Sequence, residues 1–282
     1  MKKILILGGD RRQKELFSLL TSRKLDCTSV FEGELLNTSD FIRGFDVIIL
    51  PVPFSKDGKN LFSENAALKI SLSDIISGLE PGKHVIGGSF SESFLSLAKE
   101  NGAKTFDLLG ERDFALFNAY LTAQGAVRLL LENTEDYVVS KRALVTGFGK
   151  VGKATAHFLS SLGLDVYVFA RRSEIRTHAR ALGYKTINEA ELSQSVHLFD
   201  FIFNTVPKRL FEKEDVLHMK NRAVYFELAS APFGADKENF EKAKATFVFG
   251  GGLPGRFCSF AAAKEIEKRI DRYFEKPGDT LD

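Results

Sequence analysis

Three glycines have the spacing of a turn that binds the phosphates of a dinucleotide. Gly147, Gly149 and Gly152 follow the apolar run Ala143–Thr146 in the order G-x-G-x-x-G, and a segment with helical apolar periodicity comes next. In such a turn the first glycine permits the tight turn, the second lets the backbone approach a pyrophosphate, and the third lets helix pack on strand. The helix N-terminus then holds the phosphate charge. The pattern predicts a nucleotide site, with a purely structural turn as the alternative, and its residues are Gly147, Phe148, Gly149, Lys150, Val151 and Gly152.

The end of the next predicted strand, Asp165–Phe169, indicates which nucleotide binds. An NAD site places Asp or Glu about 20 residues beyond the first glycine, to hold the ribose 2′-hydroxyl. Here the strand is followed by Arg171, Arg172 and Ser173, without an acid. Arginine forms forked, charge-assisted bonds to phosphate, so NADP is favoured over NAD; the alternative is that the arginines are merely solvated. The residues that follow the predicted strand Phe199–Phe203 are expected to bind the same cofactor. They are Asn204, Thr205, Val206 and Pro207.

The turn after the first strand carries the charges expected of a carboxylate anchor. The polar run Asp10-Arg11-Arg12-Gln13 follows Gly8-Gly9 at the start of a predicted helix. Arg12 is the foremost candidate to bind a substrate carboxylate, with Asp10 orienting its guanidinium, because a carboxylate against an anionic substrate would be repulsive. Arg256 follows another glycine-rich segment and could reach the same cleft. The alternative is that these charges are simply solvated.

Candidate groups for the reacting atoms are polar side chains rather than histidines. None of the five histidines lies at the carboxyl end of a predicted strand, which argues against a 2-hydroxy-acid dehydrogenase with a histidine base. Asn118 and Thr122 lie one turn apart on the long predicted helix Asp113–Glu132, and Ser230 follows the predicted strand Ala223–Leu228. Ser230, Asn118 and Thr122 are therefore the catalytic candidates. For the helical pair, hydrogen bonds between helices are the structural alternative.

Short apolar runs alternate with helical patterns along the chain. This predicts an α/β fold with two doubly wound, Rossmann-like lobes, each containing a parallel sheet. The substrate lobe, flavodoxin-like, is expected to span residues 1–117 and to be completed by the C-terminal helix 259–282, and the nucleotide-binding Rossmann lobe to span 118–258. A cleft enzyme would have these lobes facing each other. The predicted strands are Lys3–Leu7, Cys27–Phe31, Asp46–Leu50, Lys83–Ile86, Lys104–Asp107, Ala143–Thr146, Asp165–Phe169, Phe199–Phe203, Ala223–Leu228 and Thr246–Phe249.

Composition and charge exclude several classes of partner. The net charge of the 282 residues is only +2, so neither nucleic acid nor an anionic membrane is implied. The N-terminal apolar run stops at Gly8 and is followed by charged residues, which indicates a buried strand rather than a signal peptide. Cys27 and Cys258 lack metal-ligand spacing, and two isolated cysteines suit a reducing cytoplasm. The oligomeric state is left open, a homo-oligomer included.

Motifs spread from the first strand to Gly255 together resemble the dipicolinate synthase A-subunit family. Each is modest, but their order is specific. They are Gly8-Gly9-Asp10 with Arg12-Gln13, Leu50-Pro51-Val52, Asn118 with Thr122 and Gly125, the 147–152 turn, Asn204–Pro207, Glu227–Pro232 and Gly252–Gly255.

The resemblance implies the arrangement of the formate/glycerate and alanine dehydrogenases, and an NADP-linked oxidoreductase. The reaction implied is oxidation of dihydrodipicolinate, a small dicarboxylate, to dipicolinate during bacterial sporulation, in the cytoplasm of the mother cell. A flavoprotein-like second polypeptide of dipicolinate synthase, its B subunit, is implied as the partner. Formation of an aromatic ring favours this oxidation, so a strong base is less necessary, whereas a rigid dianion demands anchors at two places.

The sequence departs from the family after the Leu-Pro-Gly motif, where the segment Cys258–Ala263 replaces a Pro-Lys-Thr-Ala segment. The family also tends to have Ile-Pro near Tyr120-Leu121 and Glu in place of Gln124. Two other functions stay open: a 2-hydroxy-acid or amino-acid dehydrogenase of the same fold, and an NADP-sensing protein without catalysis. The carbon that gives the hydride, and whether a hydroxytetrahydro precursor is the direct substrate, are also open.

Overall fold

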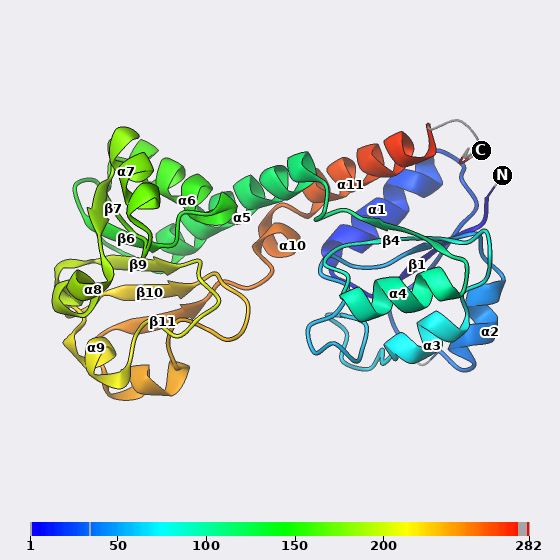
Figure 1. Cartoon of the computed structure of the whole chain (residues 1–282), viewed down its shortest axis with the longest axis horizontal. Helices are drawn as coiled ribbons and strands as arrows, with labels where there is room; N and C mark the ends of the chain where they lie inside the picture. The colour runs from blue at the N-terminus through cyan, green and yellow to red at the C-terminus, as the bar shows by residue number, and fades with distance from the viewer. Residues whose placement is uncertain (1, 34, 276–280, 282) are drawn as a thin grey trace. The chain divides into compact units, whose positions relative to one another are not determined.

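Residues 2–33, 35–275 and 281 are described by the computed structural model of the chain (Figure 1). Contacts within the chain separate two units, Met1–Phe117 with Pro254–Asp282, and Asn118–Leu253. The first therefore combines both ends of the chain. Of the helix expected over 259–282, residues 276–280 and 282 lie outside the described part.

The first unit contains a five-stranded sheet in which every pairing is parallel, as expected from the alternating pattern. Its strand order is β2-β1-β3-β4-β5, the order of flavodoxin-like folds. The strands are β1 (Ile4–Leu7), β2 (Cys27–Val30), β3 (Val47–Ile49), β4 (His84–Gly87) and β5 (Lys104–Asp107).

Helices cover both faces of this sheet, because alternate side chains of each strand point to opposite faces. In β1, Ile4 and Ile6 join one apolar cluster, whereas Leu5 and Leu7 join the other. The first cluster packs against α1 (Arg11–Ser22), α11 (Ser259–Phe274) and the start of α5 (Arg112–Glu132). The second packs against α2 (Thr38–Arg43), α3 (Leu72–Ser77) and α4 (Glu92–Glu100).

The second unit contains a six-stranded parallel sheet in the order β11-β10-β9-β6-β7-β8. Counted from β6 as the first strand, this is the order of the Rossmann fold. The strands are β6 (Arg142–Thr146), β7 (Asp165–Phe169), β8 (Lys185–Ile187), β9 (Phe201–Asn204), β10 (Val224–Glu227) and β11 (Thr246–Phe249). Its helices are most of α5, α6 (Lys150–Ser161), α7 (Ser173–Ala181), α8 (Glu189–Ser195) and α9 (Lys213–His218), with 3₁₀ turns at Val196–Leu198 and Lys237–Lys242.

Two helices carry the chain from one unit to the other: α5, and the short α10 (Leu253–Phe257). By length and composition α5 meets the criterion for a membrane-spanning helix, with a mean hydropathy of 1.2 in its most apolar window. Half of that window is buried inside the protein, and a core helix meets the same criterion.

A buried carboxylate ties the strand ends of the second unit together. Glu227, at the end of β10, has no exposed surface and accepts four hydrogen bonds. Asn204 Nδ2 (2.6 Å) and the Ala229 N–H (3.1 Å) donate to its Oε1, and the Tyr225 hydroxyl (3.0 Å) and the Gly234 N–H (2.8 Å) donate to its Oε2. Burial raises the pKa of Glu227, and the four donors only partly offset that effect.

Asn204 extends this network to the next strands. Its Oδ1 accepts from Thr146 Oγ1 at 2.5 Å and from the Val206 N–H at 3.2 Å. The ends of β6, β9 and β10 are thereby joined by side-chain hydrogen bonds in addition to the sheet ladder.

We expect Glu227→Gln to lower the free energy of unfolding by about 1–3 kcal/mol, because the new amide must turn an N–H group toward at least one buried donor. Glu241→Gln, at an exposed position, should change it by less than about 0.5 kcal/mol. Since the native state holds the Glu227 proton more tightly than the unfolded chain, the contribution of Glu227 is fully present below its unfolded pKa and falls as pH rises through its native pKa. Urea unfolding of both variants across this pH range measures the effect. Equal stabilities of wild type and Glu227→Gln would contradict it.

Candidate functional site

Each sheet has one place where the strand order reverses. In open α/β sheets, ligands bind outside the carboxyl ends of the strands at this point. The reversal lies between β6 and β9 in the second unit and between β1 and β3 in the first. The Gly147–Gly152 turn follows β6, and the segment 204–207 lies at the end of β9. In the first unit, the Asp10–Gln13 turn follows β1.

The glycine turn has the geometry that a pyrophosphate requires. Gly147 has a φ of +84°, and a Cβ there would lie 2.7 Å from Val206 and 2.9 Å from Thr205 Oγ1. A Cβ on Gly152 would strike the Gly147 carbonyl oxygen, which shows how closely helix α6 packs on the turn. At Gly149 a Cβ would meet nothing within 4 Å, and no side chain caps the N-terminus of α6. The site therefore offers open space and uncapped N–H groups, and fits a dinucleotide phosphate.

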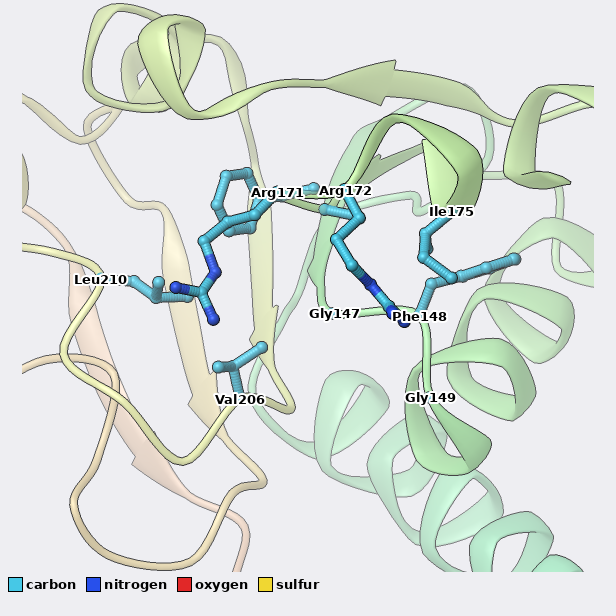
Figure 2. Close-up of a pocket in the computed structure, with 10 residues that line it drawn as sticks. Gly147, Phe148, Gly149, Arg171, Arg172, Ile175, Val206 and Leu210 are labelled. Atoms are coloured by element: carbon cyan, nitrogen blue, oxygen red, sulfur yellow. The ribbon is translucent and has the colours of Figure 1, made fainter. Parts of the chain in front are cut away.

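A pocket of about 520 Å³ opens beside this turn (Figure 2). Figure 2 shows the two arginine side chains diverging in the pocket, with Arg171 on the side of Val206 and Leu210 and Arg172 on the side of the glycine turn. The lining includes six of the residues expected from the sequence, Gly147, Phe148, Gly149, Arg171, Arg172 and Val206, and four that were not, Phe169, Ala170, Ile175 and Leu210.

The two arginines differ in their partners. Arg172 Nε lies 3.4 Å from Glu174, with both side chains largely exposed, so this ion pair contributes little. Arg171 forms no ion pair or hydrogen bond through its side chain within the described residues. Ser173 is the first residue of α7.

A third arginine, not expected from the sequence, braces this loop. Arg176 Nη1 donates to the carbonyl oxygens of Ala170 (2.7 Å) and Arg171 (2.5 Å). It lies four residues beyond Arg172, and therefore on the side of α7 that faces the end of β7. Ile175 and Arg176 could have been found from this spacing, whereas Leu210 comes from a loop without a pattern.

The remaining cofactor candidates do not line the pocket. Thr205 Oγ1 donates to the Thr146 carbonyl at 2.6 Å, Asn204 is buried in the Glu227 network, and Pro207 is exposed. Lys150 and Val151 form the first turn of α6 with Gly152, but do not line the pocket.

The catalytic candidates also lie in the second unit. Thr122 Oγ1 donates to the Asn118 carbonyl at 2.8 Å, which leaves its oxygen as an acceptor. Both residues are half-buried on α5, whereas Ser230 is exposed in the loop after β10, three residues beyond Glu227. The structure thus places Asn118 and Thr122 together and Ser230 on a different segment.

The substrate-binding candidates lie in the first unit, where Asp10 caps α1. Its carboxylate accepts from the Arg12 N–H (3.0 Å) and forms a forked ion pair with Arg12 Nε (2.8 Å) and Nη2 (2.6 Å). Gln13 Oε1 accepts from the Asp10 N–H at 3.1 Å, completing a capping box. Asp10 and Arg12 are each 3% exposed, and Arg11 is exposed.

The segment that carries Arg256 lies against this turn. A Cβ on Gly255 would strike the Asp10 carboxylate, so no larger residue fits there without a shift. Arg256 is exposed, with its guanidinium 5.0 Å from the centroid of the Phe257 ring. Among the described residues, no group of His, Cys, Asp and Glu could hold a metal ion.

Comparison with known proteins agrees with this geometry. The family profile for the N-terminal domain of the dipicolinate synthase A subunit matches residues 3–109, and that of the D-isomer specific 2-hydroxyacid dehydrogenase NAD-binding domain matches residues 111–237. The dipicolinate synthase A subunit of Bacillus subtilis is 28% identical over 269 residues, covering 90% of this chain and 89% of the relative.

Solved structures show the same fold. The dipicolinate synthase A subunit from Bacillus halodurans superposes with a TM-score of 0.80 at 22% identity, covering 98% of both chains. The D-lactate dehydrogenase of Salmonella superposes with a TM-score of 0.64 at 13% identity, covering 95% of both. The predicted α/β fold with two parallel sheets and a dehydrogenase-type NAD-binding domain is confirmed, and over most of its length the chain is similar to dipicolinate synthase A subunits.

Proposed function

We propose that this protein oxidises dihydrodipicolinate to dipicolinate with NADP as the hydride acceptor. The observation that carries the proposal is a phosphate-binding glycine turn whose pocket contains two arginines and no acid at the end of β7. Similarity to the dipicolinate synthase A subunit of Bacillus subtilis supports the substrate. In the sporulating bacterium that this function implies, the protein would act in the cytoplasm of the mother cell with the flavoprotein-like B subunit.

The proposed reaction does not require a strong acid or base from the protein. A ring carbon loses its hydrogen with two electrons, NADP is reduced to NADPH, and a ring proton is lost as the dihydropyridine becomes aromatic. Ser230, Asn118 and the acceptor oxygen of Thr122 are the groups we assign to the ring and this proton. The network around Glu227 holds the loop of Ser230 through the Ala229 N–H.

Binding a dianion requires positive charge, and we assign this role first to the Asp10–Gln13 turn. Asp10 holds the Arg12 guanidinium through Nε and Nη2, which leaves Nη1 outside the fork. Arg11 and Arg256 are exposed, on this turn and on the segment against it, and could add positive charge for the substrate.

Turnover of a substrate panel tests the proposal. Wild-type protein, in the presence or absence of the B subunit, is given NADP and dihydrodipicolinate, or NADPH and simple 2-oxo acids. The proposal predicts NADPH formation with the first mixture and negligible oxidation with the second. Reduction of 2-oxo acids would indicate a hydroxy-acid dehydrogenase instead. Binding of NADP without turnover of either would indicate a sensing protein.

The preference for NADP should depend on the two pocket arginines. Loss of a charge-assisted bond to the 2′-phosphate costs about 1.5–3 kcal/mol, so Arg171→Ala and Arg172→Ala should each weaken NADP binding and leave NAD binding nearly unchanged. Arg180→Ala, on helix α7 directly after these two arginines but outside the pocket lining, is the control. Calorimetric titration of both nucleotides into the three variants measures this. If neither pocket variant lowers the ratio of NADP to NAD affinity, the assignment is wrong.

Arg12→Ala should raise the Michaelis constant for dihydrodipicolinate strongly and leave NADP affinity nearly intact, while Arg11→Ala does less. Because the change leaves Asp10 buried without its cation, it should also lower stability by about 3–5 kcal/mol. The unfolding temperature of each variant is therefore measured first, and the steady-state kinetics are recorded well below it. An Arg12→Ala enzyme with the wild-type Michaelis constant would remove Arg12 from the substrate site, and Arg256 would be the next residue to test.

A further inference from the structure

The segment after β3 returns to the Gly8-Gly9 turn and covers the reversal point of the first sheet. The Gly9 N–H donates to the Phe62 carbonyl at 2.8 Å, and the Glu64 N–H donates to the Gly9 carbonyl at 2.9 Å. Gly9 and Ser63 thereby form a parallel bridge that continues the direction of β1. The segment follows β3, whereas the Gly8-Gly9 turn follows β1. Residues from the ends of both strands therefore meet beside the Asp10–Gln13 turn.

A hairpin within this segment runs from Phe54 to Phe62. The Phe62 N–H donates to the Phe54 carbonyl at 2.8 Å, and Ser55 pairs with Leu61. At the tip the Asp57 carboxylate accepts from the N–H groups of Asn60 (2.7 Å) and Lys59 (2.8 Å). These donors hold the pKa of Asp57 far below its usual range. The hairpin conformation is therefore fixed by its own hydrogen bonds.

Lys56 is the basic residue that this hairpin directs back toward the turn. Its Nζ lies 3.7 Å from the centroid of the Phe62 ring, and Phe62 is the residue bonded to Gly9. Partial burial lowers the pKa of Lys56, against the opposing effects of Asp10 and Glu64, and Arg12 lowers it further. The ammonium thus shares the electric field of the Asp10–Arg12 pair. Within the described residues Lys56 has no hydrogen bond and no ion pair.

The turn beside it also contains an unsatisfied donor. Gln13 is fully buried, and its amide orientation follows from the Asp10 N–H, which requires Oε1 as acceptor. Gln13 Nε2 then has no acceptor among the described residues. A buried N–H group without a partner is rare in a folded protein, and an oxygen of a bound water or ligand would satisfy it.

From this arrangement we propose that Lys56 holds a carboxylate of the substrate at the reversal point of the first sheet, acting with the Asp10–Gln13 turn. Two of the Arg12 nitrogens are already engaged by Asp10, and Arg12 is 3% exposed. Lys56, in contrast, is exposed, so a ligand can reach its ammonium group beside the turn. The assignment rests on the proposed function, because it takes a pyridine dicarboxylate as the ligand.

Lys56→Met tests the assignment, with Lys59→Met on the same hairpin as the matched control and Lys56→Arg as the charge-preserving variant. Calorimetry measures the affinity of each intact protein for dipicolinate, for the monocarboxylate picolinate, and for NADP. Lys56→Met should weaken dipicolinate binding about 10–100-fold and remove most of the preference for dipicolinate over picolinate. Its NADP affinity should stay within about twofold, and Lys59→Met should match wild type throughout. Lys56→Arg should recover most of the binding.

A change in preference between the two acids is an effect that a purely structural lysine would not produce. If wild type binds dipicolinate and Lys56→Met binds it equally well, Lys56 is not the anchor, whereas the proposed function stands. If wild type itself does not bind dipicolinate, the proposed function fails and the assignment of Lys56 fails with it.

Discussion

The carboxylate of Glu227 is the constraint on which the nucleotide-binding unit depends. A buried carboxylate is costly unless donors surround it, and here the donors come from three segments: the side chain of Asn204, the hydroxyl of Tyr225, and the N–H groups of Ala229 and Gly234. Meeting this demand fixes the loops after β9 and β10. Because the Asn204 loop contains Thr205 and Val206, which lie against Gly147, the same demand shapes one wall of the nucleotide pocket.

The first unit shows the same principle on a smaller scale. Asp10 is nearly buried, and the positive charge that compensates it is Arg12, two residues along the same turn. Position 255 accepts only glycine without a shift, because the Asp10 carboxylate occupies the space that a Cβ would need. In both units a buried acid organises the strand ends at which the sheet order reverses, and the exposed cations nearby, Arg171, Arg172 and Lys56, are the ones that we propose bind anionic ligands.

The sequence predicted the fold class and most strands, because buried parallel strands are continuous apolar runs and the glycine spacing has a physical cause. It did not predict β8 or the short helices α2, α8, α9 and α10. These elements have three to seven residues and polar or mixed sequences, so they are stabilised by tertiary contacts rather than by local pattern. Lys56 was missed for a related reason, because a hairpin within a loop leaves no motif. The absence of an acid at the end of β7 is visible in the sequence itself, because it depends on residue type alone.

A structure of the wild-type protein with NADP and dipicolinate bound tests the central claim most directly. We expect the pyrophosphate on the Gly147–Gly152 turn, the 2′-phosphate between the guanidiniums of Arg171 and Arg172, and a dipicolinate carboxylate within hydrogen-bond distance of Lys56 Nζ. A nucleotide bound elsewhere, or one whose ribose 2′ position points away from both arginines, would contradict it.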